Sequence, residues 1–171
     1  MKLRAGVMLG ATLAVAGGIS QPRLPARPTL PEPKPAESPL FISLKRAAET
    51  LRPAPTRAAH PKFGFVLRSS VAVDGKPGEL EIYALPADRM AIMVLKSAPI
   101  PKAASITRDN LWRILIESGE YSPAHVAYNL NERRFEFRTP IAPADVSPAS
   151  LQRELARLQN MAKVTKAIWR S

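Results

Sequence analysis

The stretch YSPAHVAYNLNERRFEFRTPI, residues 121–141, decides the fold of this chain. It alternates small or apolar residues with polar ones, breaks at residues 131–132, and then alternates again. Alternation with a period of two is typical of strands that bury one face, and a short break of turn-forming residues joins two such strands into a hairpin. We therefore expect a two-stranded ribbon. Its inward-facing residues are expected to be Phe135 and Phe137, opposite Val126 and Tyr128.

The residues before this ribbon indicate a helix followed by more strands. FISLKRAAETLR, residues 41–52, has helical apolar spacing and is stopped by Pro53. After a loop through His60 and Pro61, residues 62–73 alternate as a strand does. ELEIYALPADRMAIMVLKS, residues 79–97, then predicts a second hairpin with its turn at Pro86 to Arg89.

The returning strand of that hairpin is apolar on both faces. A strand that does not alternate is usually buried from both sides, so we expect it to be central in the sheet or to meet a partner with its second face. The sequence does not decide which face is open. The candidate partner or dimer face is therefore Ala91, Met93 and Leu95, or Met90, Ile92 and Val94.

Two further helices complete the predicted elements. Residues 105–119 have Ser105 or Thr107 as N-cap, Gly119 as the stop, and an apolar stripe that we expect to face the core. The last helix starts at Ser147-Pro148. The predicted stripes are Leu111, Trp112, Leu115 and Ile116 in the first, and Leu151, Leu155, Leu158, Ala162, Thr165 and Trp169 in the second.

The order of elements is helix, three strands, helix, two strands, helix. Runs of strands with helices between them favour an α+β fold: a single antiparallel sheet of about five strands with helices packed on one face. The other face of the sheet must then be solvated or paired.

The N-terminus has the layout of a secretory signal peptide, expected over residues 1–20. Lys2 and Arg4 precede an apolar run from Ala5 to Ala16, and small residues follow. Cleavage is feasible after Ala16 or after Ser20, so we expect a protein exported to the periplasm or beyond. An uncleaved membrane anchor is the alternative.

Residues 21–39 form a proline-rich stretch, in which seven of the 18 prolines of the chain fall. Proline lacks the backbone donor that helices and sheets need, so we expect a disordered, extended linker here and one folded domain over residues 40–171. Pro-rich segments also bind aromatic grooves, but a spacer is the commoner use.

Composition excludes several kinds of chemistry. The chain has no cysteine, and its two histidines, His60 and His125, have no acidic or histidine cluster around them, so we expect no metal, no cofactor and no catalytic site. Glu136 lies between Arg134 and Arg138 and is expected to belong to a surface charge ladder. The formal charge of +11 is scattered over every element, and nucleic acid is therefore not the expected partner.

Three stretches together resemble the YbjN-like domains, putative bacterial sensory transduction regulators related in fold to type III secretion chaperones of the Tir-chaperone class. The stretches are LWRILIES, AHVAYNLNERRFEFRTPI and VSPASLQRELARLQ, and the resemblance covers about residues 40–171. It is carried by apolar spacing and turn residues: Leu111 and Leu115, Val126 with Phe135 and Phe137, Pro140, and Ser147-Pro148 with Leu151. The resemblance implies a non-enzymatic, protein-binding module that often dimerises.

The function that the sequence favours is a protein-binding or regulatory module exported from the bacterial cytoplasm. Its expected partner is another protein or a second copy, bound through the open sheet face. The alternative is a tethered basic domain that contacts anionic polymers or lipids of the envelope weakly, through charge alone.

Overall fold

The computed structural model describes residues 36–100 and 107–166. The predicted signal peptide, residues 21–35 of the predicted linker, Ser105 and Trp169 lie outside the described residues. Three of the predicted linker residues belong with the folded part. Pro39 is the first residue of the first helix, the Ser38 hydroxyl caps that helix by accepting from Phe41 N at 3.2 Å, and Glu37 pairs with Arg57 at 2.7 Å.

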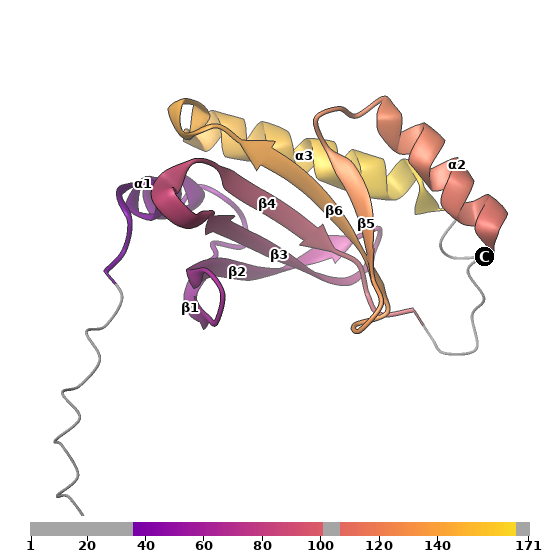
Figure 1. The fold of residues 1–171 in the computed structure, drawn as a ribbon, viewed down its shortest axis with the longest axis horizontal. Coiled ribbons are helices and arrows are strands. Elements are labelled where there is room, and N and C mark those ends of the chain that lie inside the picture. The colour runs from indigo at the N-terminus through magenta and orange to yellow at the C-terminus, as the bar shows by residue number, and fades with distance from the viewer. Residues whose placement is uncertain (1–35, 101–106, 167–171) are drawn as a thin grey trace, which may run out of the picture. The chain divides into compact units, whose positions relative to one another are not determined.

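The described part of the chain contains one six-stranded antiparallel sheet with the spatial order β1-β2-β3-β4-β6-β5 (Figure 1). The fold class is therefore the predicted α+β class, with β4 in the interior of the sheet between β3 and β6 as expected. The strands are β1 (Thr56–His60), β2 (Gly64–Val73), β3 (Lys76–Ala84), β4 (Ala91–Lys96), β5 (His125–Asn129) and β6 (Arg134–Ile141).

Strand β1 is the one strand that the sequence did not predict, since residues 56–60 were expected to be a loop. The segment TRAAH is short, has no large apolar residue, and shows no alternation of apolar and polar residues in its sequence. It becomes a strand because it pairs with β2 along its full length, from Thr56 opposite Arg68 to His60 opposite Gly64. Tertiary pairing here overrides weak local preference.

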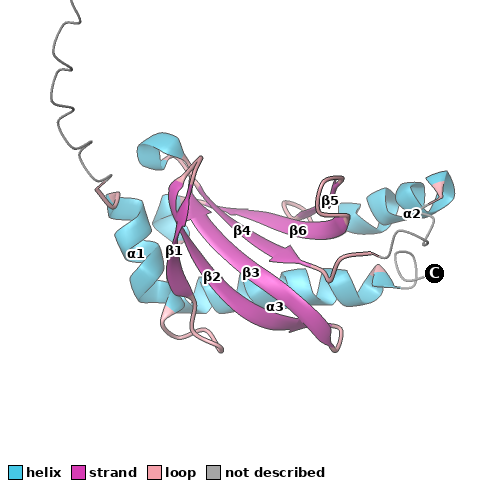
Figure 2. Cartoon of the chain, turned by 90° about the horizontal axis from the view of Figure 1, so that it is seen from below, coloured by secondary structure: helices cyan, strands magenta, loops and turns pink. Residues whose placement is uncertain are grey.

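The three helices take two different positions. The helices are α1 (Pro39–Ala48), α2 (Arg108–Gly119) and α3 (Pro148–Val164), and two short 3₁₀ turns lie at η1 (Pro86–Asp88) and η2 (Pro143–Asp145). Helices α1 and α3 contact each other and lie across one face of the sheet (Figure 2). Helix α2 instead packs on β5, at the edge of the sheet.

The core lies between the sheet and the α1/α3 layer. The predicted ribbon is formed by β5 and β6, with Val126 opposite Phe137 and Tyr128 opposite Phe135, as the alternation required. Helix α3 buries the predicted line of its leucines and begins at a capping box, in which Ser147 and Ser150 each bond the other's backbone N–H. Thr107 caps α2 by accepting from Asn110 N.

Candidate docking surfaces

The two candidate triplets of the central strand lie on opposite faces of the sheet. Ala91, Met93 and Leu95 are fully buried beneath α1 and α3, in the core cluster. Ile92 and Val94 point to the face that no helix covers, and Met90 lies just before the strand with 36% of its surface exposed. An open-face partner would therefore have to use the second triplet.

The open face is covered by ion pairs of its own. Val94 lies beside Glu81 of β3 and Arg138 of β6, and only 2% of Val94 is exposed. Lys96 Nζ lies 2.7 Å from Glu81 Oε2, and Arg68 Nη2 donates to Glu81 Oε1 at 2.6 Å. The long charged side chains thus shield the apolar positions between them from an incoming partner.

A second group of charged residues continues the ion pairs across β6 and β5. Glu136 accepts from Arg138 Nη2 at 2.5 Å and from Asn129 Nδ2 at 2.8 Å, while Arg134 pairs with Glu132 and reaches Glu79 at 3.4 Å. The predicted alternation of charges around Glu136 is therefore present, but Glu136 itself is only 4% exposed and is not a surface residue. The charges form a structural network rather than an acid–base pair, because each carboxylate faces cationic or amide donors.

The network sets the charge state of its two most buried carboxylates. Burial alone would raise the pKa of Glu81, but hydrogen bonds from Lys96 and Arg68 outweigh it and hold that pKa below the ordinary value of 4.5. Burial is also the largest influence on the pKa of Glu136, and donors from Asn129 and Arg138 again bring it below 4.5. Both groups stay ionised at neutral pH.

The apolar stripe of α2 does not face the core, and the prediction that it would was wrong. The helix buries only Ile114 and Ser118. The four stripe residues are among the large apolar side chains that are left exposed, with exposed fractions of 40% for Leu111, 65% for Trp112, 58% for Leu115 and 61% for Ile116. We call these four residues the α2 stripe.

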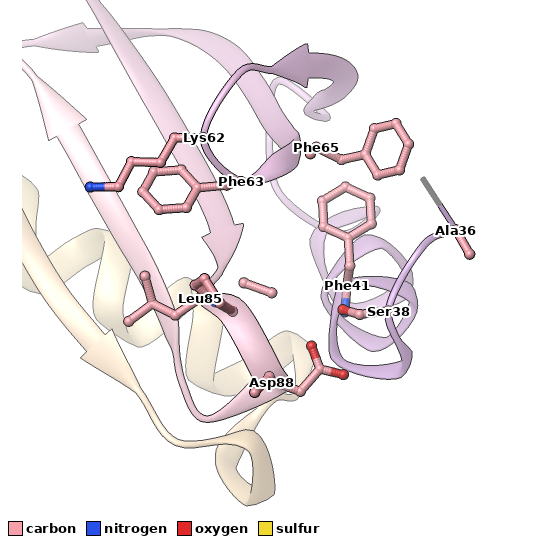
Figure 3. Close-up of a pocket in the computed structure, with 12 residues that line it drawn as sticks. Ala36, Ser38, Phe41, Lys62, Phe63, Phe65, Leu85 and Asp88 are labelled. Atoms are coloured by element: carbon pink, nitrogen blue, oxygen red, sulfur yellow. The ribbon is translucent and has the colours of Figure 1, made fainter. Parts of the chain in front are cut away.

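An aromatic pocket of about 240 Å³ lies at the end of the sheet where α1 begins (Figure 3). Phe41 and Phe65 face each other with ring centroids 5.7 Å apart, and Phe63 stands on the other side of the opening with Lys62. The carboxylate of Asp88 is already engaged, because its Oδ2 accepts from Leu40 N at 3.1 Å. The pocket could hold an apolar side chain.

Neither histidine is placed for catalysis among the described residues. Nδ1 of His60 accepts from the backbone N–H groups of Lys62 and Phe63, each at 3.2 Å, and thereby closes the β1–β2 turn. His125 is the exposed first residue of strand β5. Residues 36–100 and 107–166 contain no group of three His, Asp or Glu side chains that could hold a metal ion. In the same ranges no helix has both the length and the hydropathy that a bilayer crossing requires.

Comparisons with known proteins support the fold and leave the family open. No known family model and no curated protein matches the chain, so membership of the YbjN-like domains stays a prediction. Solved structures do match in fold. A chain of the HopA1–SchA chaperone–effector complex is 12% identical, with a TM-score of 0.53 over 77% of this chain and 93% of its own length. A chain of the heterodimeric ExoU–SpcU complex from the type III secretion system of Pseudomonas aeruginosa is also 12% identical, with a TM-score of 0.50 over 73% and 96%.

The predicted likeness to type III secretion chaperones is therefore confirmed at the level of fold. The sequence singled out the open sheet face as a docking surface and missed the other two. Nothing in it revealed the aromatic pocket, which joins α1, the β1–β2 turn and the β3–β4 turn. The α2 stripe was visible as a pattern, but its outward direction was not.

Proposed function

We propose that this protein is a non-enzymatic protein-binding module that docks its partner on the α2 stripe. One observation carries the proposal: four large apolar side chains stand exposed side by side on one helix. Single exposed apolar residues are ordinary, whereas a contiguous apolar patch on a soluble protein usually marks a binding surface.

The energetics favour a covering partner. Burying a side chain of this size completely contributes about 1.5–3 kcal/mol, and each member of the stripe still has roughly half of its surface to bury. The stripe could therefore contribute about 4 kcal/mol, from which the entropy of association is subtracted. Trp112 is the expected centre of the energy, because tryptophan dominates many protein interfaces.

The fold comparisons add independent support. Both matched chains belong to structures of protein–protein complexes, one a chaperone with an effector and the other a heterodimer of a type III secretion system. A protein partner for this chain agrees with that likeness.

The open sheet face is the second proposed docking surface, through Met90, Ile92 and Val94. It ranks below the α2 stripe because Val94 is covered and its neighbours are already ion-paired. A partner on this face would have to match charged groups, which gives specificity more than affinity.

A photo-crosslinking amino acid at position 115 tests the proposal in the native host. Leu115 lies in the stripe, and Leu130 in the β5–β6 turn is a matched control because it is also an exposed leucine, with 79% of its surface accessible. We expect a defined covalent adduct with a protein from position 115 and none from position 130. No adduct from position 115, or the same adducts from both positions, would contradict docking on the α2 stripe.

A further inference from the structure

The aromatic pocket lies where the proline-rich stretch joins the folded domain. Its lining includes Ala36, the first residue that the structure describes, and Ser38, the cap of α1. Residues 21–35 therefore end at the rim of the pocket (Figure 3). A short tether gives a ligand an effective concentration of the order of millimolar, so even a weak motif in this stretch would be held at the pocket.

The prolines of this stretch recur with a period of three. Pro22, Pro25, Pro28 and Pro31 follow one another at intervals of three residues. Because a polyproline-II helix has about three residues per turn, this spacing sets the four rings along one edge, which we call the proline edge. The edge contains the P-x-x-P pattern that aromatic-lined grooves recognise. A plain spacer needs many prolines but has no use for this register.

The pocket offers the surface that such an edge requires. It is lined by Phe41 of α1, Phe63 of the β1–β2 turn and Phe65 of β2. Its volume of about 240 Å³ is below the roughly 300–1,000 Å³ of most small-molecule sites, so it suits an occupant of side-chain size. A proline ring meets this requirement, and a preformed polyproline-II helix loses little conformational freedom when it binds.

The charges of the two parts decide which contacts can hold the stretch. Residues 21–35 contain three Lys/Arg and one Glu, a net charge of +2, and residues 40–171 contain 20 Lys/Arg and 12 Asp/Glu, a net charge of +8. Since like net charges repel, the two parts need specific contacts to stay together. One such contact is available, because Glu32 directly follows the proline edge and the exposed Lys62 stands at the opening of the pocket beside Phe63 (Figure 3).

We propose that the chain's own proline-rich stretch occupies the aromatic pocket, with Pro28 and Pro31 of the proline edge against the phenylalanine rings. Glu32 then lies beside Lys62. The four residues before Ala36 span about 12 Å when extended, enough to lead the chain back across a pocket of this volume. The docked stretch covers the ring faces and fixes the direction in which the N-terminus leaves the domain.

This contact is separate from the proposed function. The pocket lies at α1, whereas α2 packs on β5, at the opposite edge of the sheet from β1. The inference therefore does not depend on the α2 stripe, and neither result decides the other.

Two spin labels on the full mature chain test the inference. The chain has no cysteine, so labels can be attached at two introduced cysteines alone. Leu24→Cys lies in the stretch but off the proline edge, and Lys45→Cys lies on the exposed side of α1. Double electron–electron resonance measures the distribution of distances between the two labels. We expect a narrow distribution, because a docked stretch has one position, and a broad one would overturn the inference.

Two matched double substitutions test the register without touching the folded domain. Pro28→Ala/Pro31→Ala removes two rings from the proline edge and should broaden the distribution. Pro33→Ala/Pro35→Ala removes as many prolines outside the edge and should leave the distribution narrow. A narrow distribution in the first variant, or a broad distribution in both, would overturn docking through the proline edge.

Substitutions in the pocket test the other side of the contact. Phe63→Ala should broaden the distribution while circular dichroism shows the domain still folded. Lys62→Glu should broaden it in part, and the charge swap Glu32→Lys/Lys62→Glu should narrow it again. A folded Phe63→Ala variant with a narrow distribution overturns the pocket as the site, and a charge swap that restores nothing overturns the position of Glu32.

An excess of unlabelled chain separates docking within one chain from exchange between copies. Docking within one chain leaves the narrow distribution unchanged when the labelled protein is diluted in this way. Loss of the narrow distribution would place the stretch on a second copy and overturn the inference.

Discussion

Replacement of Glu81 by glutamine should destabilise the domain far more than the same change at an exposed glutamate. The Glu81 side chain is 6% exposed and holds Arg68 on one oxygen and Lys96 on the other. In Glu81→Gln, the ammonium group of Lys96 stays almost buried, and the nearest of its other carboxylates, Glu79, is 3.9 Å away. A buried charge that loses its partner is costly, whereas an exposed ion pair contributes little.

The expected loss lies between these two limits. Breaking a fully buried pair costs about 3–5 kcal/mol, and hydrogen bonds to charged groups contribute about 1.5–3 kcal/mol each. Since Arg68 is 43% exposed and can turn to water, we expect about 2–3 kcal/mol for the whole change. For a chain of this size that corresponds to a melting temperature lower by roughly 5–10 °C.

The matched control is Glu132→Gln. Glu132 pairs with Arg134, but its side chain is 43% exposed, so its removal should change stability by less than about 1 kcal/mol. Urea denaturation at pH 7 measures both variants. Equal, small losses in the two would show that the open-face network behaves as ordinary surface charge, and the account of a self-covered sheet face would be wrong.

The pH dependence gives a second readout of the same network. The pKa of Glu81 and the pKa of Glu136 are both lower in the folded protein than their ordinary value of 4.5, so the unfolded chain takes up protons first as the pH falls. Their stabilising contribution is complete above pH 4.5 and disappears as the pH falls through the folded pKa values. We therefore expect Glu81→Gln to lose less stability than the wild type between pH 5 and pH 3.

Two further predictions concern the sheet face and the N-terminus. Met93→Glu should unfold the domain because Met93 is fully buried beneath the helices, whereas Ile92→Glu should leave the domain folded, as circular dichroism can measure. If Ile92→Glu also abolishes partner binding, the open face is a docking surface. If both variants are unfolded, the idea of an interface at this strand fails. Intact-mass measurement of protein from the native host should show a chain that begins at Gly17 or Gln21, and a species that retains residues 1–16 would reject cleavage in favour of an anchor.

The sequence predicted those parts of the fold that depend on local patterns. The ribbon and its register follow from alternation, and the central position of β4 follows from its absence; all three are confirmed. The Ser147 cap and the leucine line of α3 follow from spacing in the same way. Strand β1 could not be predicted, because TRAAH has no apolar alternation and forms a strand only through its pairing with β2.

The docking surfaces were harder to predict because they depend on what packs against what. Met93 and Val94 are neighbouring apolar residues, yet Met93 is covered by helices, whereas Val94 is covered by Glu81, Arg138 and their partners. The aromatic pocket needs Phe41, Phe63 and Phe65 to meet from two separate elements and a turn. No spacing along the chain encodes either arrangement.

The exposure of the α2 stripe follows from where the sheet ends. Helices α2 and α3 both carry apolar residues at helical spacing, and periodicity alone does not say which side of a helix meets the core. Helix α3 has 17 residues and crosses the broad face of the sheet, so its apolar line is buried from Leu151 to Ala162. Helix α2 packs on β5, an edge strand of five residues that offers contact to only one narrow side of the helix, the side of Ile114 and Ser118. The stripe therefore points past the edge of the sheet, and a partner bound there would continue the helical layer beyond the last strand.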